Sequence, residues 1–108
     1  MGSNFKVKID PYVIAKVDDI DYYYFEKFGN FEMGILLTKE LKDVKETIQD
    51  NPYIGTLPRY AVLKRQGYRV LILEKNLAFY KVNEEKREVI IYAFVDQRQD
   101  YLNIIRGL

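Results

Sequence analysis

The stretch YRVLILEKNLAFYKVNEEKREVIIYAFVD, residues 68–96, decides the fold. It contains three runs rich in β-branched, aliphatic and aromatic residues, at 68–74, 77–83 and 88–95, and such runs are typical of β-strands. Only Lys75-Asn76 separates the first two runs, and only 84–87 separates the last two. Because parallel strands need a much longer crossover, the stretch predicts an antiparallel three-stranded meander.

Side chains that alternate along these strands fall on two faces of the sheet. If Lys75-Asn76 is a two-residue turn, the first face carries Leu71, Leu73, Ala78, Tyr80, Val82, Val89, Ile91 and Ala93. The second face then carries Ile72, Glu74, Phe79, Lys81, Tyr92, Phe94 and Asp96. We expect helices to cover the aliphatic first face. The second face mixes aromatic and charged residues, and we expect it to stay open to another macromolecule.

Upstream of the meander the sequence predicts one strand and two helices. Residues 5–9 alternate apolar and cationic side chains, as a strand with one buried face does. Asp10-Pro11 supplies an N-cap and a proline at the first helical position, and Gly29 suits a helix end, so a helix is expected over 11–28. A second helix, capped by Asn30, should end at Asn51-Pro52 and pack antiparallel to the first. The apolar stripes of the two helices are Val13, Val17, Ile20, Tyr24 and Phe28, and Met33, Leu37, Leu41, Val44 and Ile48.

Two further segments complete the chain. Residues 51–67 are interpreted as a loop, although the run 60–63 also suits a short helix or an extra strand. Residues 100–105 are expected to form one or two helical turns. The predicted fold is a single α+β domain over residues 1–108: a strand, an antiparallel helical hairpin, then a three-stranded antiparallel meander in one sheet, and a short C-terminal helical turn.

The composition excludes several classes of function. The chain has no Cys and no His, so it lacks disulfides, thiolate nucleophiles, Cys-based zinc sites and Ser-His triads. We expect no cofactor and no metal. No apolar run approaches the roughly 20 residues that a membrane span needs, and the first residues do not resemble a signal peptide. A cytoplasmic protein is therefore expected.

Charge is distributed unevenly along the chain. The net charge is only +1, but residues 1–54 contain 7 Lys and Arg against 10 Asp and Glu, whereas residues 55–108 contain 10 against 6. The cationic C-terminal half indicates an anionic partner for that half, and an uneven but merely solvated surface is the alternative interpretation.

The order of elements and three short motifs resemble the RelE/ParE family of bacterial toxins. The motifs are Gly-Tyr-Arg-Val-Leu at 67–71, Asn-Leu-Ala-Phe-Tyr-Lys-Val-Asn-Glu at 76–84, and Val-Asp-Gln-Arg-Gln-Asp-Tyr at 95–101. The resemblance covers nearly the whole chain. It implies a toxin of a type II toxin-antitoxin (plasmid stabilisation) system, which is neutralised by a cognate antitoxin protein.

The resemblance implies one of two targets: some members cut messenger RNA in the ribosome, and others inhibit DNA gyrase. Cleavage by the 2′-OH of the RNA needs a proton acceptor, a donor to the leaving oxygen, and cations near the phosphorus. Arg69 and Arg98 coincide with basic positions of the family pattern and are candidate catalytic residues. Tyr101 is the candidate proton shuttle, ahead of Asp96 or Glu74. The candidate RNA-binding residues are Lys64, Arg65 and Lys81.

Alternatives remain open for each of these residues. Arg69 also suits a structural link between the sheet and a helix. Arg98 could instead form an ion pair with Asp100, and Tyr101 could simply pack under the C-terminal tail. Asp96 stands where the ribonuclease members usually carry His or a basic residue, and Leu77 stands where their catalytic Arg begins the middle strand. The first hypothesis is therefore a metal-independent, ribosome-dependent endoribonuclease that inhibits translation. A non-enzymatic gyrase inhibitor and a degenerate toxin that only binds antitoxin are the alternatives.

Overall fold

The structure is a computed structural model that describes residues 4–29, 32–106 and 108, with side chains from residue 37 onward in the second helix. Its elements are β1 (Lys6–Ile9), α1 (Pro11–Phe28), α2 (Glu32–Asp50), α3 (Ala61–Arg65), β2 (Arg69–Ile72), β3 (Asn76–Asn83), β4 (Glu88–Asp96) and α4 (Tyr101–Arg106). The α+β fold and the order of its predicted elements are confirmed. The expected cap Asn30 and the side chain of Met33 lie outside the described residues.

The first helix begins and ends at the residues that its sequence predicts. The Asp10 carboxylate accepts a hydrogen bond of 2.9 Å from the backbone N–H of Tyr12, and Pro11 occupies the first turn, where no hydrogen-bond donor is needed. Gly29 ends the helix at φ 61°, in the left-handed region that glycine adopts without a Cβ penalty. Because these signals are local, the helix bounds are readable from the sequence.

The four strands form one sheet in the order β1-β4-β3-β2. The meander β2-β3-β4 is antiparallel as predicted, but β1 pairs in parallel with β4, so the sheet is mixed. No tight turn joins β1 to its neighbour. The helical hairpin α1-α2 and the meander both lie between them in the chain, and this long connection permits a parallel pairing.

The first turn of the meander differs from the predicted one. Leu73 donates its N–H to the carbonyl oxygen of Asn76 at 2.9 Å, so Glu74-Lys75 is the two-residue turn. The pairing of β2 with β3 therefore moves by two residues along the strand. A shift of two keeps every side chain on its own face, whereas a shift of one would exchange the faces.

A β-bulge in β4 changes the predicted faces of three residues. Phe79 pairs with Ala93 but Tyr80 pairs with Ile91, which leaves Tyr92 as the extra residue of β4. Beyond the bulge the alternation is reversed. Ala93 is buried with Phe79 on the second face, not with Ile91 on the first, and Phe94 packs on the side of the helical hairpin. Asp96 likewise lies beside α1 and α2 rather than on the second face.

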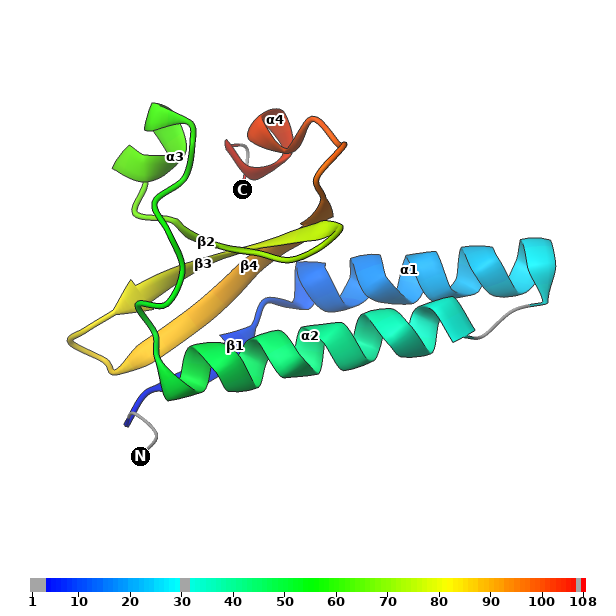
Figure 1. Ribbon diagram of the computed structural model, residues 1–108, viewed down its shortest axis with the longest axis horizontal. Helices are drawn as coiled ribbons and strands as arrows, with labels where there is room; N and C mark the ends of the chain where they lie inside the picture. Colours follow the sequence, from blue (N-terminus) through cyan, green and yellow to red (C-terminus); the bar gives the residue numbers. More distant parts are fainter. Residues whose placement is uncertain (1–3, 30–31, 107) are drawn as a thin grey trace.

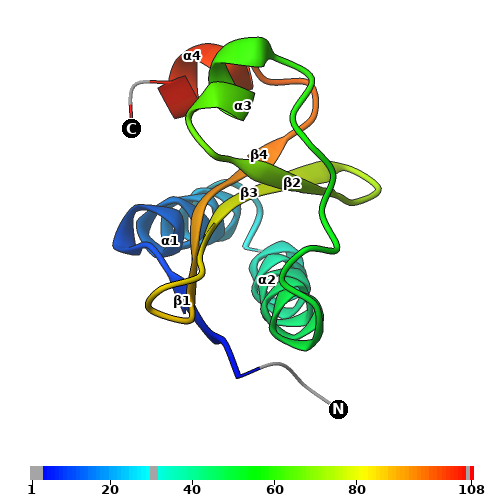
Figure 2. The same ribbon diagram turned by 90° about the vertical axis from the view of Figure 1, so that its left-hand side faces the viewer.

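Helices cover both faces of the sheet (Figures 1 and 2). The hairpin α1-α2 lies against the first face, as predicted, and the core between them is formed by Val7, Val44, Ile48, Ala78, Tyr80, Val89 and Ile91. Short helices α3 and α4 lie side by side over the second face. There, fully buried Leu63 of α3 and Ile105 of α4 pack on Val70, Leu77, Phe79 and Val95.

The expectation of an open apolar sheet face is therefore wrong, and so is the interpretation of 51–67 as a loop throughout. Burying one side chain of the size of Leu63 or Ile105 contributes about 2 kcal/mol, which stabilises helices too short to form alone. The five residues of α3 give no helical period, so only their tertiary packing reveals them. The segment before α3 is also held to the sheet, by a bridge between Thr56 and Val70.

Exposed apolar surface lies instead on the helical hairpin. Figure 1 shows α1 and α2 extending well past the sheet. Val13 and Val17, near the start of α1, are buried, whereas Ile20 is 39% exposed and Phe28 66% exposed. The second half of the predicted apolar stripe thus has no sheet to cover. Among the described helices, none is long and apolar enough to cross a membrane.

Candidate functional site

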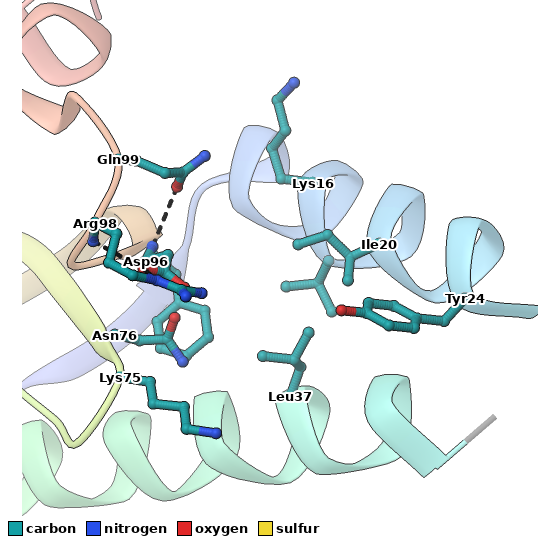
Figure 3. A pocket seen from close by; sticks show the side chains of 11 residues that line it. Lys16, Ile20, Tyr24, Leu37, Lys75, Asn76, Asp96, Arg98 and Gln99 are labelled. Carbon is teal, nitrogen blue, oxygen red and sulfur yellow. Dashed lines mark hydrogen bonds and ion pairs between the residues drawn. The ribbon is translucent and has the colours of Figure 1, made fainter. Parts of the chain in front are cut away.

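A groove opens where the hairpin leaves the sheet (Figure 3). It has a volume of about 530 Å³ and lies between α1, α2 and the end of β4. Its apolar lining comes from Val17, Ile20, Leu37 and Phe94. Tyr24 reaches in from α1, and the cationic side chains of Lys16, Lys75 and Arg98 surround the apolar part. An apolar floor with a mainly cationic rim suits an amphipathic, acidic protein segment.

An exposed ion pair lies at the edge of the groove, where β4 ends. The Arg98 guanidinium donates two hydrogen bonds to the Asp96 carboxylate, from Nε at 3.0 Å and from Nη2 at 2.9 Å. The backbone N–H of Arg98 donates a third, at 2.8 Å. These side-chain and backbone hydrogen bonds lower the pKa of Asp96 to about 2, and the same pairing raises the pKa of Arg98. Both groups are therefore ionised at neutral pH, and the alternative pairing of Arg98 with Asp100 is not formed.

Arg69 is held by the chain itself. Its guanidinium donates a hydrogen bond of 2.7 Å to the carbonyl oxygen of Gly55 and a longer one, of 3.4 Å, to that of Tyr53. It also lies over the Tyr53 ring, 5.1 Å from the centroid. Arg69 therefore links β2 to the segment that leads into α3 rather than to a helix.

Tyr101 belongs to the layer on the other face of the sheet. Its ring lies 5.7 Å from that of Tyr60 and 5.4 Å from that of Phe79, between centroids, and it is half-buried. Ring contacts of this kind contribute packing energy in addition to area burial. They match the packing role that the sequence left open for Tyr101.

The predicted RNA-binding residues lie on this same side. Lys64 and Arg65 are exposed on α3. The Lys81 ammonium lies 4.6 Å from the ring centroid of Tyr68 and 5.4 Å from that of Tyr92. Both rings pack in the cluster beneath α3 and α4, so Lys81 faces the same layer as Lys64 and Arg65.

The three candidate catalytic residues thus have separate surroundings. Arg98 lines the groove beside α1, Arg69 binds carbonyl groups of the segment before α3, and Tyr101 packs beneath α3 and α4. Of the three residues, only Arg98 lines the groove. Lys16, Ile20 and Lys75, which do share the groove with Arg98, were not candidates from the sequence. Ile20 belongs to the predicted apolar stripe of the first helix, whereas no sequence signal pointed to Lys16 or Lys75.

The described part of the chain contains no group of three His, Cys, Asp or Glu side chains placed to hold a metal ion.

The helical hairpin on one face of a four-stranded sheet is consistent with the RelE/ParE-like fold. The family model described as ParE toxin of type II toxin-antitoxin system, parDE, matches residues 7–101. The chain belongs to this family. It is the toxin of a type II toxin-antitoxin pair, and its partner is an antitoxin. Among curated proteins, no sequence gives a significant match.

Proposed function

We propose that this toxin acts by binding, as a non-enzymatic inhibitor of DNA gyrase in the cytoplasm. The different contacts of Arg69, Arg98 and Tyr101 carry the proposal. RNA cleavage requires a proton acceptor, a proton donor and a cation at one phosphate, within hydrogen-bond reach of it. Here Arg69 binds backbone carbonyls, Arg98 pairs with Asp96, and Tyr101 packs against Tyr60 and Phe79, so the three share no common partner among these contacts.

The charge states of these groups support the same conclusion. Asp96, the second candidate for proton transfer, has a pKa of about 2 and is ionised at neutral pH, which is far from the value that suits a general base or acid there. The hydrogen bonds of Arg69 to carbonyl oxygens occupy part of its guanidinium. A proposal of inhibition by binding needs neither group to react.

The exposed hairpin provides a surface for such binding. Tyr22 and Phe28 are each 66% exposed, and Tyr23 is 53% exposed, on the part of α1 that projects past the sheet. Tyrosine and phenylalanine are common at the centres of protein interfaces because they bury much area at a small cost in conformational entropy. Tyr24, which lines the groove, contacts the rings of Tyr23 and Phe28, so exposed aromatic side chains continue from the groove along α1.

Two assays with purified protein test the proposal. In the first, relaxed plasmid is incubated with gyrase and ATP, and the toxin is expected to block supercoiling in proportion to its concentration. In the second, ribosomes translating a defined message receive the toxin, and primer extension is expected to find no new 5′ ends. Codon-phased cuts in the second assay would support the endoribonuclease hypothesis instead. Activity in neither assay would support a toxin that only binds its antitoxin.

A further inference from the structure

The sheet separates the charges of this molecule into two layers. The hairpin helices, 11–28 and 32–50, contain five Lys and nine Asp or Glu residues. On the other side, the segment 57–68 that includes α3, together with α4, contains four Lys or Arg and no Asp or Glu. The hairpin helices are therefore net acidic and the segments with α3 and α4 net basic, and Figure 2 shows these two sets of helices on opposite faces of the sheet.

The cations of the second layer are available to a ligand. Arg59, Lys64, Arg65 and Arg106 are exposed. Lys81 lies on β3 over the ring of Tyr68, and it shares a shallow pocket with Glu84, Glu85 and Glu88 without forming an ion pair with them. We call these five basic residues the cationic surface. The ion pairs found among the described residues, at 4.0 Å or less, are Lys8–Glu88, Arg87–Glu84 and Arg98–Asp96, so no carboxylate pairs with any member of the cationic surface.

We propose that the cationic surface binds the phosphate backbone of duplex DNA. Unpaired cations gathered on one face attract a polyanion and gain affinity by displacing its counterions. The aromatic rings nearby favour a duplex over a single strand, because Tyr60, Tyr68 and Tyr92 are buried or half-buried and pack against other rings or beneath cations. They offer no free face on which an unpaired base would stack.

An RNA duplex has the same phosphate backbone chemistry as DNA. We choose DNA as the ligand because of the proposed function, and this part of the inference rests on that proposal. A gyrase inhibitor works beside the DNA that gyrase holds. Because the hairpin and the cationic surface lie on opposite faces of the sheet, one molecule can contact protein with the first and DNA with the second. Contacts with phosphates alone carry no base specificity.

Fluorescence anisotropy with a labelled 20-base-pair DNA duplex tests the inference. Binding is expected at 50 mM salt, with a log–log salt slope of about −3 to −4 if three or four phosphates are neutralised. The single strand and an RNA duplex of the same sequence are measured alongside and are expected to bind no more tightly. Absent binding at 50 mM salt, a slope near zero, or tighter binding to either of the other probes overturns the proposal.

A matched pair of variants locates the contact. Lys64→Glu with Arg65→Glu is expected to weaken duplex binding by at least about 10-fold and to reduce the magnitude of the salt slope by about 2. Lys39→Glu with Lys42→Glu makes the same change in net charge at exposed positions of α2, and is expected to alter binding by less than about 3-fold. Arg59→Glu with Arg106→Glu gives a second test if the first variant does not fold. Equal losses in the α2 control would show that net charge alone decides binding.

The supercoiling assay separates failure of this inference from failure of the proposed function. Inhibition of gyrase without binding to the duplex would support the proposed function and contradict the DNA-binding inference. Binding to the duplex through the cationic surface without inhibition of gyrase would support the inference and contradict the proposed function.

Discussion

The backbone N–H of Gly55 donates a hydrogen bond of 2.9 Å to the hydroxyl oxygen of Tyr80, which lies in the middle of β3 with no exposed surface. Burial raises the pKa of Tyr80, with the Gly55 hydrogen bond and the nearby Arg69 acting in the opposite direction. The carbonyl oxygen of the same glycine accepts from Arg69. Gly55 is thus bound through both backbone groups, and this fixes the segment between α2 and α3 on the sheet.

Replacing Gly55 with alanine is expected to destabilise the fold. A Cβ at this position would lie 2.6 Å from the Tyr80 hydroxyl oxygen and 2.9 Å from the backbone oxygen of Val70, and real Cβ atoms do not approach so closely. Relieving the overlap requires a backbone shift that costs about 1–3 kcal/mol. Urea unfolding followed by circular dichroism measures the loss. An unchanged midpoint would mean that this segment is not seated against Tyr80.

Tyr80→Phe tests the hydrogen bond without adding volume. The variant leaves the buried N–H of Gly55 without its acceptor, and the expected loss in the free energy of unfolding is about 1–3 kcal/mol. Tyr68→Phe is the matched control, since Tyr68 is also buried and the described residues provide no hydrogen bond to its hydroxyl. That control is expected to change stability by less than about 0.5 kcal/mol. Equal effects in the two variants would contradict a specific role for the Tyr80 hydroxyl.

Much of the fold could be predicted because its signals are local. The Asp10-Pro11 cap, Gly29 and the polar turn at 84–87 each act within a few residues, and the elements that they bound are confirmed. The parallel pairing of β1 depends on a contact across most of the chain, and no local pattern encodes it. The bulge at Tyr92 adds one residue to a run that is apolar on both faces, so alternation could not reveal it.

The candidate site was harder to predict for a related reason. Arg69, Arg98 and Tyr101 were chosen by their positions in the family pattern, but what surrounds each one is set by tertiary contacts. Arg69 meets a backbone carbonyl of Gly55, 14 residues earlier, and Tyr101 meets rings from two other elements. Part of the Lys and Arg excess of the C-terminal half lies on and around α3 and α4, which the chain places together on one side of the sheet.

The ionisation of Asp96 is expected to make the stability of the fold depend on pH in the acid range. Its pKa falls from an ordinary value of 3.8 to about 2 in the folded protein, so the pair with Arg98 stabilises the folded state fully above about pH 4. This contribution is lost as the pH falls from about 4 to 2, because the carboxylate is then protonated in both states. The difference in urea midpoint between the wild type and Asp96→Asn is expected to shrink over that interval. A difference that stays constant down to pH 2 would exclude the ion pair as its source.

A charge placed in the groove tests its role in binding the target. Ile20 lines the groove and is 39% exposed, so Ile20→Asp should leave the core intact and change stability by less than about 1 kcal/mol. Inhibition of gyrase supercoiling is expected to weaken by at least about 10-fold, because a partner would have to desolvate the new carboxylate. Ile72→Asp, at the exposed edge strand β2, is the control and should inhibit as the wild type does. If the Ile20→Asp protein inhibited gyrase as strongly as the wild type, the groove would not be part of the interface with the target.

Tyr101→Phe distinguishes the two proposed mechanisms at a single atom. The substitution keeps the ring, and therefore the contacts with Tyr60 and Phe79, but removes the hydroxyl that a proton shuttle would use. If the toxin acts by binding, growth arrest on induction without antitoxin is expected to equal that of the wild type. If Tyr101 transfers a proton in RNA cleavage, the loss should reach about 100-fold or more, since general acid–base catalysis contributes on that scale. Tyr101→Ala, which also removes the ring, should lower stability by about 3 kcal/mol, and its comparison with Tyr101→Phe separates lost packing from lost chemistry.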